Sequence, residues 1–376
     1  MKEYLNELIN LRHVLHRNPE VSCEEKYTAQ RISEFLTENT SVEIHSGIGG
    51  NGLAAIFKGK NPGKTVLARC ELDALPIKEN SKTEYSSIVE NVSHLCGHDG
   101  HMAILIGVAL KIQQNPPEKG TVILFYQGAE ETGQGAEAAL KHSFFDHFIP
   151  DTVIALHNIP GFKKGTVITS DSFFASSSTG ICVDFKGKTS HAAEPEKGIN
   201  PAKALSEVIS GFIDIPKKIT NFSLVTAVGA TLGNGAYGTS AGDAQFKATL
   251  RSYSGQDMEK IKHYGEKLVS ELAQKHGLEF EVSYHEFFPA TVNDPAVNSL
   301  IRESAIENSL EIKKLDAPFR WSEDFGYFTS RFSGGMFGLG SGEDQPPLHH
   351  EDYDFPDEII ESGVNMFVSI IRKVLD

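Results

Sequence analysis

The chain has 376 residues, of which 40% are hydrophobic and 23% charged, and its formal net charge is −15 at pH 7. This length predicts two domains, or one domain with a large insertion, and the composition is that of a folded globular protein. The negative charge argues against a nucleic-acid partner, because nucleic-acid binding needs Lys and Arg to neutralise phosphates.

The N-terminal residues predict an acidic amphipathic helix rather than a signal peptide. No run approaches the roughly 18 apolar residues that a membrane span needs, so we expect no membrane partner. The four cysteines, Cys23, Cys70, Cys96 and Cys182, follow no disulfide spacing. We therefore expect reduced thiols and a cytoplasmic location.

The first part of the chain alternates helical and strand patterns. Apolar residues at helical spacing over residues 4–37 predict two helices, which Pro19 separates. Strands are expected at residues 52–57, 65–70, 120–127 and 152–157, and an apolar helix at residues 102–114. The first two strands are expected to be neighbours in a sheet, joined by a turn at residues 61–63. The alternation predicts an α/β fold with helices on both faces of the sheet and functional groups on the loops at strand ends.

From residue 175 the pattern changes to the order β-α-β-β-α-β. The expected elements are a strand at 181–187, a helix at 201–212, strands at 222–229 and 244–252, a helix at 259–276 and a strand at 278–284. This order is typical of a ferredoxin-like α+β domain, which we place as an insertion at residues 175–285. The first domain then comprises residues 1–174 and 286–376, and its last part has a helix at 296–308, a strand at 335–340 and a helix at 357–374.

The eight residues from His94 to His101 contain three histidines, a cysteine and an aspartate, directly before the apolar helix. Thiolate, imidazole and carboxylate groups are ligands for zinc, manganese and cobalt. The alternative interpretation is a polar loop in which Asp99 is the helix N-cap. Cys96 and His98 alone would indicate a metal only weakly.

Two adjacent carboxylates, Glu130 and Glu131, follow the strand at 120–127. Neighbouring residues of an extended segment point in opposite directions, so one carboxylate can bind a metal while the other acts as a base toward the substrate. The alternative is an ordinary acidic first turn of a helix, where the helix dipole favours Glu.

Two further histidines lie where ligands could gather. His157 ends a strand and His349 lies in a Gly- and Pro-rich loop, and either one alone would be interpreted as structural. The set of Cys96, His98, Glu131, His157 and His349 supplies five ligands, enough for two ions that share one of them.

Short segments over nearly the whole chain resemble the metal-dependent aminoacylase, hippurate hydrolase and auxin-conjugate amidohydrolase family, which is related to glutamate carboxypeptidase and di-zinc peptidases. The matching segments are LHRNPE at 15–20, DALPI at 73–77, CGHDGH at 96–101, GAEE at 128–131, LHN at 156–158, HAA at 191–193, SEDF at 322–325 and LH at 348–349.

The resemblance implies a di-zinc-peptidase-like catalytic domain and an inserted domain that makes a homodimer contact. It implies that Cys96 bridges two divalent ions and that His98, Glu131, His157 and His349 complete their sites. The ions would be manganese or zinc, with cobalt or nickel as alternatives.

The resemblance also implies roles for three further residues. Glu130 is similar to the general base that activates water, His191 to an oxyanion-stabilising histidine, and Asp73 to a carboxylate that orients a metal-binding histidine. The implied reaction is hydrolysis of the amide bond of N-acyl amino acids or related small amides. A dipeptidase or carboxypeptidase on the same dinuclear site is the alternative.

Some positions depart from the family pattern. Cys70 and Glu71 stand where relatives often have Ala and Asp, and Cys70 is either an extra ligand or, as we favour, a buried small residue of a strand. The inserted domain also differs, which leaves the substrate open. Arg251 and Asn200 are its candidate substrate contacts, although a surface or interface salt bridge would equally explain Arg251. A redox role for Cys96 and a non-catalytic metal-binding protein are further alternatives.

Overall fold

The structure is a computed structural model that describes residues 2–376, and its internal contacts divide the chain into two compact units. Unit 1 comprises Met1–Phe174, Thr291–Pro318 and Glu323–Asp376, and unit 2 comprises Ala175–Ala290 and Phe319–Ser322. The return to unit 1 comes later than residue 286, because β13 (Glu279–Phe288) continues beyond the expected strand end. The segment Phe319–Ser322 belongs to unit 2, where the Ser176 amide donates to the Phe319 and Trp321 carbonyl oxygens.

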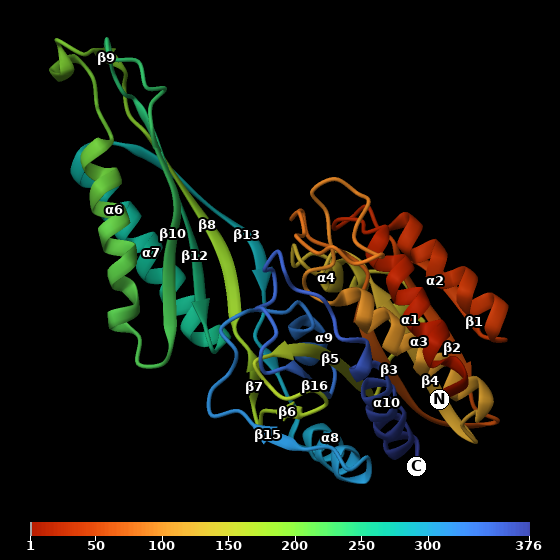
Figure 1. Cartoon of the computed structure of the whole chain (residues 1–376). Coiled ribbons are helices and arrows are strands. Elements are labelled where there is room, and N and C mark those ends of the chain that lie inside the picture. Colours follow the sequence, from red (N-terminus) through yellow and green to blue (C-terminus); the bar gives the residue numbers. More distant parts are fainter. Residues whose placement is uncertain (1) are drawn as a thin grey trace. The chain divides into compact units, whose positions relative to one another are not determined.

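Unit 1 contains an eight-stranded mixed sheet in the order β1-β2-β4-β3-β5-β16-β6-β15, which confirms the expected α/β class (Figure 1). The strands are β1 (Glu43–Ile48), β2 (Gly52–Lys58), β3 (Asn61–Glu71), β4 (Lys119–Gln127), β5 (Thr152–Pro160), β6 (Val167–Thr169), β15 (Ile312–Lys314) and β16 (Gly334–Gly342). Strands β4, β3, β5 and β16 run parallel to one another, so their carboxyl ends meet at one edge of the sheet.

Helices cover both faces of this sheet, as expected. Those of unit 1 are α1 (Lys2–Arg17), α2 (Lys26–Asn39), α3 (His98–Gln114), α4 (Gly135–Leu140), α5 (Phe144–His147), α8 (Pro295–Glu307), α9 (Gly326–Arg331) and α10 (Ile360–Leu375). Alternate residues of β4 face opposite sides: Leu124 packs in the core with α3 and α10, whereas Phe125 contacts Phe145 of α5 and Phe328 of α9.

Two expectations about the strands were wrong. Strands β2 and β3 are not neighbours, because β4 lies between them, antiparallel to β2 and parallel to β3. The crossover through α3 returns the chain beside β3, which places the almost wholly buried β4 in the middle. Residues 61–63 form no turn between strands but belong to the start of β3.

Helix α3 begins at His98, four residues before the expected start, so the histidine cluster lies in its first turn rather than on a loop. The N-cap is Gly97, with φ +88°, and a Cβ there would lie 2.5 Å from Asn158 Oδ1. Asp99 is therefore not the N-cap. Its Oδ2 instead accepts hydrogen bonds from Arg12 and His16 of α1, each at 2.9 Å.

Unit 2 has the expected β-α-β-β-α-β order and an antiparallel sheet in the order β10-β12-β8-β13. Its elements are β8 (Ser177–Lys186), α6 (Ala202–Asp214), β10 (Ser223–Leu232), β12 (Asp243–Ser252), α7 (Gly255–His276) and β13. The core between the sheet and the helices includes Phe212 of α6 and Phe246 of β12. A small two-stranded sheet joins β9 (Ser190–His191) and β11 (Thr239–Ser240).

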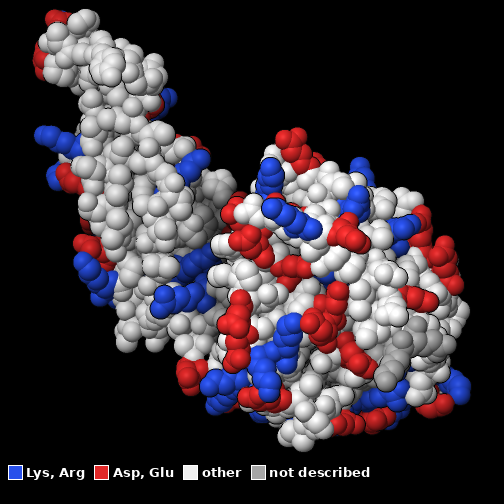
Figure 2. All heavy atoms as spheres, viewed as in Figure 1, with Lys and Arg blue, Asp and Glu red and all other residues white. Residues whose placement is uncertain are grey.

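The surface carries charges of both signs. Figure 2 shows acidic and basic side chains interspersed over the visible face of unit 1. None of the helices in residues 2–376 is long and apolar enough to span a bilayer.

Candidate metal centre

The structure brings the five expected ligands together at the carboxyl edge of the sheet in unit 1. Cys96 precedes α3, His98 begins it, Glu131 follows β4, His157 lies in β5 and His349 follows β16. Their potential ligand atoms form two groups, and within each group all atoms lie within 4.8 Å of one another. The groups are Cys96, His98 and His157, and Cys96, Glu131 and His349. Of the residues in these two groups, only Cys96 belongs to both.

Two buried atoms of this cluster lack a hydrogen-bond partner among the described residues. They are His98 Nε2 and Glu131 Oε1, which lie 3.9 Å apart. A buried polar atom without a partner is costly, and this separation is too long for a hydrogen bond. Both residues belong to candidate ligand groups that share Cys96, so each of these atoms is available to bind a divalent ion. The residues therefore fit a divalent ion.

Backbone carbonyls fix how the histidines face this centre. The Nδ1 atom of His98 donates to the Asp73 carbonyl oxygen at 2.8 Å, and Nδ1 of His157 donates to the Asn158 carbonyl oxygen at 2.9 Å. In both rings Nε2 is then the nitrogen left to bind a metal, which it does in its deprotonated form. The His157 Nε2 lies 3.4 Å from Cys96 Sγ. His349 Nε2 lies 3.5 Å from Glu131 Oε2, and the side chain of His349 remains 48% exposed.

Asp73 lies where it can hold two ligands in place. Its Oδ2 accepts hydrogen bonds from Ser22 Oγ at 2.7 Å and from the Glu131 amide at 2.9 Å. Its Oδ1 is 3.6 Å from His98 Nδ1. Asp73 therefore contacts both candidate ligands, and its orienting role stays a prediction.

The sequence analysis missed a buried charged network beside the ligands. Arg69 of β3 forms ion pairs with Glu71, with Glu323 at 3.0 Å and with Asp324 at 2.6 Å. Glu71 also accepts a hydrogen bond from His101 Nδ1 at 2.6 Å. Part of this network could have been predicted from the sequence. Arg69 and Glu71 are two positions apart on a strand, so their side chains point to the same side of the sheet.

The structure also shows whether two further residues, His101 and Cys70, are available as metal ligands. His101 is not an available ligand, since its Nε2 accepts a hydrogen bond from the Asn158 amide at 3.2 Å while Nδ1 serves Glu71. Cys70 points to the opposite side of β3 and packs in the hydrophobic core.

Burial and neighbouring charges shift the pKa values of the residues in this cluster. Burial, followed by the charges of Glu323 and Glu131, raises the pKa of Glu130 well above its usual range. Burial raises the pKa of Glu131 to about 7, although His98 opposes the rise.

Two ligands hold their protons more firmly than usual. Burial opposes the charge of His98, but hydrogen bonding to Asp73 and the charges of Glu71 and Glu131 raise the pKa of His98 to about 10. Burial, followed by the charges of Glu131 and Glu130, also raises the pKa of the Cys96 thiol.

The three candidate residues of the inserted domain all lie in unit 2. His191 is exposed in β9 and pairs with Thr239 of β11. Asn200 Nδ2 donates to Ser240 Oγ at 3.0 Å, so it lies close to the same small sheet. Arg251 lies in β12 and donates to the Arg320 carbonyl oxygen at 3.1 Å and to Ser322 Oγ at 3.0 Å.

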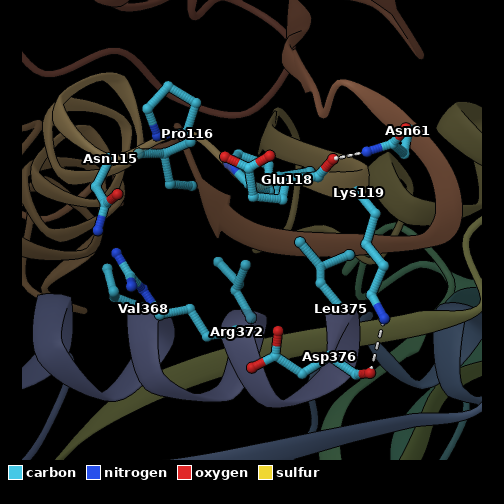
Figure 3. Close-up of a pocket in the computed structure, with 13 residues that line it drawn as sticks. Asn61, Asn115, Pro116, Glu118, Lys119, Val368, Arg372, Leu375 and Asp376 are labelled. Carbon is cyan, nitrogen blue, oxygen red and sulfur yellow. Dashed lines mark hydrogen bonds between the residues drawn. The ribbon is translucent and has the colours of Figure 1, made fainter.

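A cavity of about 550 Å³ lies at the opposite edge of the sheet of unit 1, between the α3–β4 loop and α10 (Figure 3). Its polar rim is internally bonded: Lys119 Nζ donates to the Asp376 carbonyl oxygen at 2.9 Å and Asn61 Nδ2 to the Glu118 carbonyl oxygen at 3.2 Å. It contains none of the candidate metal ligands.

Comparison with known protein families agrees with this geometry. Residues 67–373 match the sequence profile described as peptidase family M20/M25/M40. The chain belongs to this family.

Relatives of this M20/M25/M40 protein align over almost its whole length. N-acetyl-L-cysteine deacetylase of Bacillus subtilis is 28% identical over 374 residues, which cover 98% of this chain and 88% of the relative. Hippurate hydrolase of Campylobacter jejuni is 28% identical over 376 residues, which cover 98% and 97%. The crystal structure of a dinuclear metal-binding M20 peptidase from Bacillus subtilis superposes with a TM-score of 0.86 at 25% identity, covering 100% of this chain and 99% of that one. The M20 chain is accordingly a metal-dependent hydrolase of C–N amide bonds, as the sequence predicted.

The pKa shifts predict that metal affinity of this M20 hydrolase rises with pH. A metal must displace the protons of His98 and Cys96, and at pH 6 also that of Glu131, because ligands bind in their deprotonated forms. Between pH 6 and pH 9 the dissociation constant for Mn²⁺ should fall by about tenfold per pH unit for each proton released. Calorimetric titration in buffers of different ionisation enthalpy measures both quantities.

The exposed residue His147 offers a control, since His147→Ala should keep the same pH dependence. An affinity that does not change with pH, with no proton release, would contradict this account of the ligands.

Proposed function

We propose that Cys96, His98, Glu131, His157 and His349 hold two divalent metal ions and that the enzyme hydrolyses N-acyl amino acids. The observation that carries the proposal is the pair of unpartnered buried atoms, His98 Nε2 and Glu131 Oε1, within ligand groups that share Cys96. Manganese or zinc suits this mixture of thiolate, imidazole and carboxylate, with cobalt or nickel as alternatives.

Glu130 is the proposed general base. When bound, divalent ions lower the pKa of water, polarise an amide carbonyl and favour the ionised form of nearby carboxylates. Glu130 Oε1 accepts a hydrogen bond from the Asp324 amide at 3.3 Å, which limits the movement of the carboxylate. From this position Glu130 takes the proton of the attacking water and returns it to the leaving nitrogen. Asp73 keeps His98 in its metal-binding orientation.

The substrate class follows from the relatives. The two named relatives act on N-acetyl-L-cysteine and hippurate, both of which are N-acyl amino acids. A dipeptidase or carboxypeptidase remains the second candidate, because the structural neighbour with a dinuclear site is described as a peptidase. The cytoplasmic location remains a prediction, consistent with four free cysteines.

We also propose that two chains complete each substrate site. Asn200 and His191 lie beside β11, which precedes β12, whereas Arg251 lies near the other end of β12. Eight residues of strand separate Asp243 from Arg251, or about 26 Å at 3.3 Å per residue. A small substrate cannot bridge that distance within one chain, so Arg251 of one chain and His191 with Asn200 of the partner are the proposed contacts.

The role of Glu130 predicts a large loss of turnover with the metal retained. Glu130→Gln keeps the size of the side chain but cannot accept a proton, so kcat should fall by at least about 10²–10⁴-fold. The measurement is a panel of acetyl- and benzoyl-amino acids beside dipeptides, with the metal content determined for each protein. Glu137→Gln, on the exposed surface of α4, should match the wild type. Full turnover by Glu130→Gln would refute the proposed base, and faster cleavage of dipeptides would favour the peptidase alternative.

Two-chain sites predict complementation between inactive variants. His191→Ala removes a proposed oxyanion donor and should lower kcat by about 10²–10³-fold. Glu130→Gln removes the proposed base, which the other chain contributes to the same site. In a mixed dimer one of the two sites has both residues intact, so such dimers should recover up to about half of the activity of the wild-type dimer. The test is activity after co-refolding or co-expression, with each variant alone as the control. No recovery in confirmed mixed dimers would place both residues within one chain.

A further inference from the structure

The residue before the proposed base has an unusual backbone. Ala129 has φ +53°, a left-handed conformation that residues other than glycine rarely adopt. The turn that follows is closed by hydrogen bonds from the Gly133 amide to the Glu130 carbonyl oxygen at 2.7 Å and from the Gly135 amide to the Ala129 carbonyl oxygen at 2.9 Å. The direction in which Glu130 points therefore depends on how Ala129 is held.

A carboxylate from a distant segment holds Ala129. Oε1 of Glu25, which precedes α2, accepts hydrogen bonds from the Ala129 amide at 2.7 Å and the Cys23 amide at 2.9 Å. Oε2 accepts one from Asn51 Nδ2 at 2.9 Å. The fit is tight, because a Cβ on Gly128 would lie 3.1 Å from Oε2.

This carboxylate is buried without a cation. Glu25 is 0% exposed, and among the described side chains of residues 4–376 no Lys, Arg or His forms an ion pair with it. A buried charge is costly unless its hydrogen bonds are well made. The packing of α2 is supplied by other residues, Thr28, Ile32 and Leu36, so helix stability alone does not require a charge at position 25.

We propose that Glu25 is a positioning residue, which holds Ala129 in its left-handed conformation and so aims Glu130 at the reacting water. Glu25 acts through the backbone and does not itself contact the substrate. The inference rests on the proposed role of Glu130 as the base. Misplacement of a catalytic group by about 1 Å can cost about 100-fold in rate, which sets the size of the expected effect.

The test compares Glu25→Ala with Glu25→Gln in the metal-loaded full-length enzyme. Glu25→Ala should lower kcat by about 100-fold with KM and metal content nearly unchanged. Glu25→Gln can still accept from the Ala129 amide, so it should keep kcat within about tenfold of the wild type. Adding Ala129→Gly to Glu25→Ala should restore part of the lost kcat, because glycine adopts positive φ without the cost of a Cβ.

Two matched controls separate positioning from general stability. Glu24→Gln changes the exposed neighbour and should leave kcat and the unfolding midpoint unchanged. Leu36→Ala, in the core face of α2, should lower the midpoint of thermal unfolding but leave kcat of the folded enzyme unchanged. If Glu25→Ala does not fold, Gly128→Ala disturbs the same contact from the other side and should lower kcat in the same way.

The outcomes distinguish this inference from the proposed function. Wild-type kcat in Glu25→Ala or in Gly128→Ala would overturn the inference, while loss of turnover in Glu130→Gln would still support the base. A loss in Glu25→Gln equal to that in Glu25→Ala would also overturn it, because the charge rather than the Ala129 bond would then matter. Full turnover by Glu130→Gln would instead refute the role of Glu130 as the base, on which this inference rests.

Discussion

The concentration of buried carboxylates at one edge of the sheet is the constraint on which the site depends. The set comprises Glu71, Asp73, Glu130, Glu131, Glu323 and Asp324, which are all buried or nearly so. Arg69 neutralises only part of this charge, through its ion pairs with Glu71, Glu323 and Asp324. Buried anions without a matching charge cost several kcal/mol each. Divalent cations beside Glu131 would remove much of that cost, which links the stability of the folded centre to metal binding.

The sheet topology explains why distant segments meet here. Strands β4, β3, β5 and β16 are parallel, so the residues that follow β3, β4 and β16 emerge at the edge where His157 of β5 lies. The beginning of α3 adds Cys96 and His98 at the same edge, with the left-handed Gly97 between them. Asp73 and Glu25 then fix the turn that carries Glu130 and Glu131. The candidate ligands and the proposed base are thus held by contacts within unit 1.

Residue chemistry and position were enough to select five candidate ligands that the structure brings together, because Cys, His and Glu near strand ends can be identified from the sequence alone. The α/β class and the β-α-β-β-α-β insertion were likewise readable from hydrophobic periodicity. The neighbours of β3 could not be predicted in this way. Strands that follow one another in the chain usually pair, but here the later strand β4 lies between β2 and β3. The predicted start of α3 was too late, because the polar residues of its first turn are also typical of a loop.

The interactions that support the ligands could not be predicted, because they join distant positions. Arg69 and Asp324 are 255 positions apart, and Glu25 and Ala129 are 104 apart. Each pair is an ordinary polar combination that many other residues of the chain could also have formed. The separation of Asn200 and Arg251 could not be predicted either. The sequence suggested both as substrate contacts, but within one chain they lie near opposite ends of β12.

An anomalous difference map from crystals of the manganese-loaded protein tests the dinuclear centre most directly. We predict two peaks per chain, both within bonding distance of Cys96 Sγ, one beside His98 and His157 and the other beside Glu131 and His349. A single peak, or peaks held instead by Glu130, Glu323 and Asp324, would contradict the account.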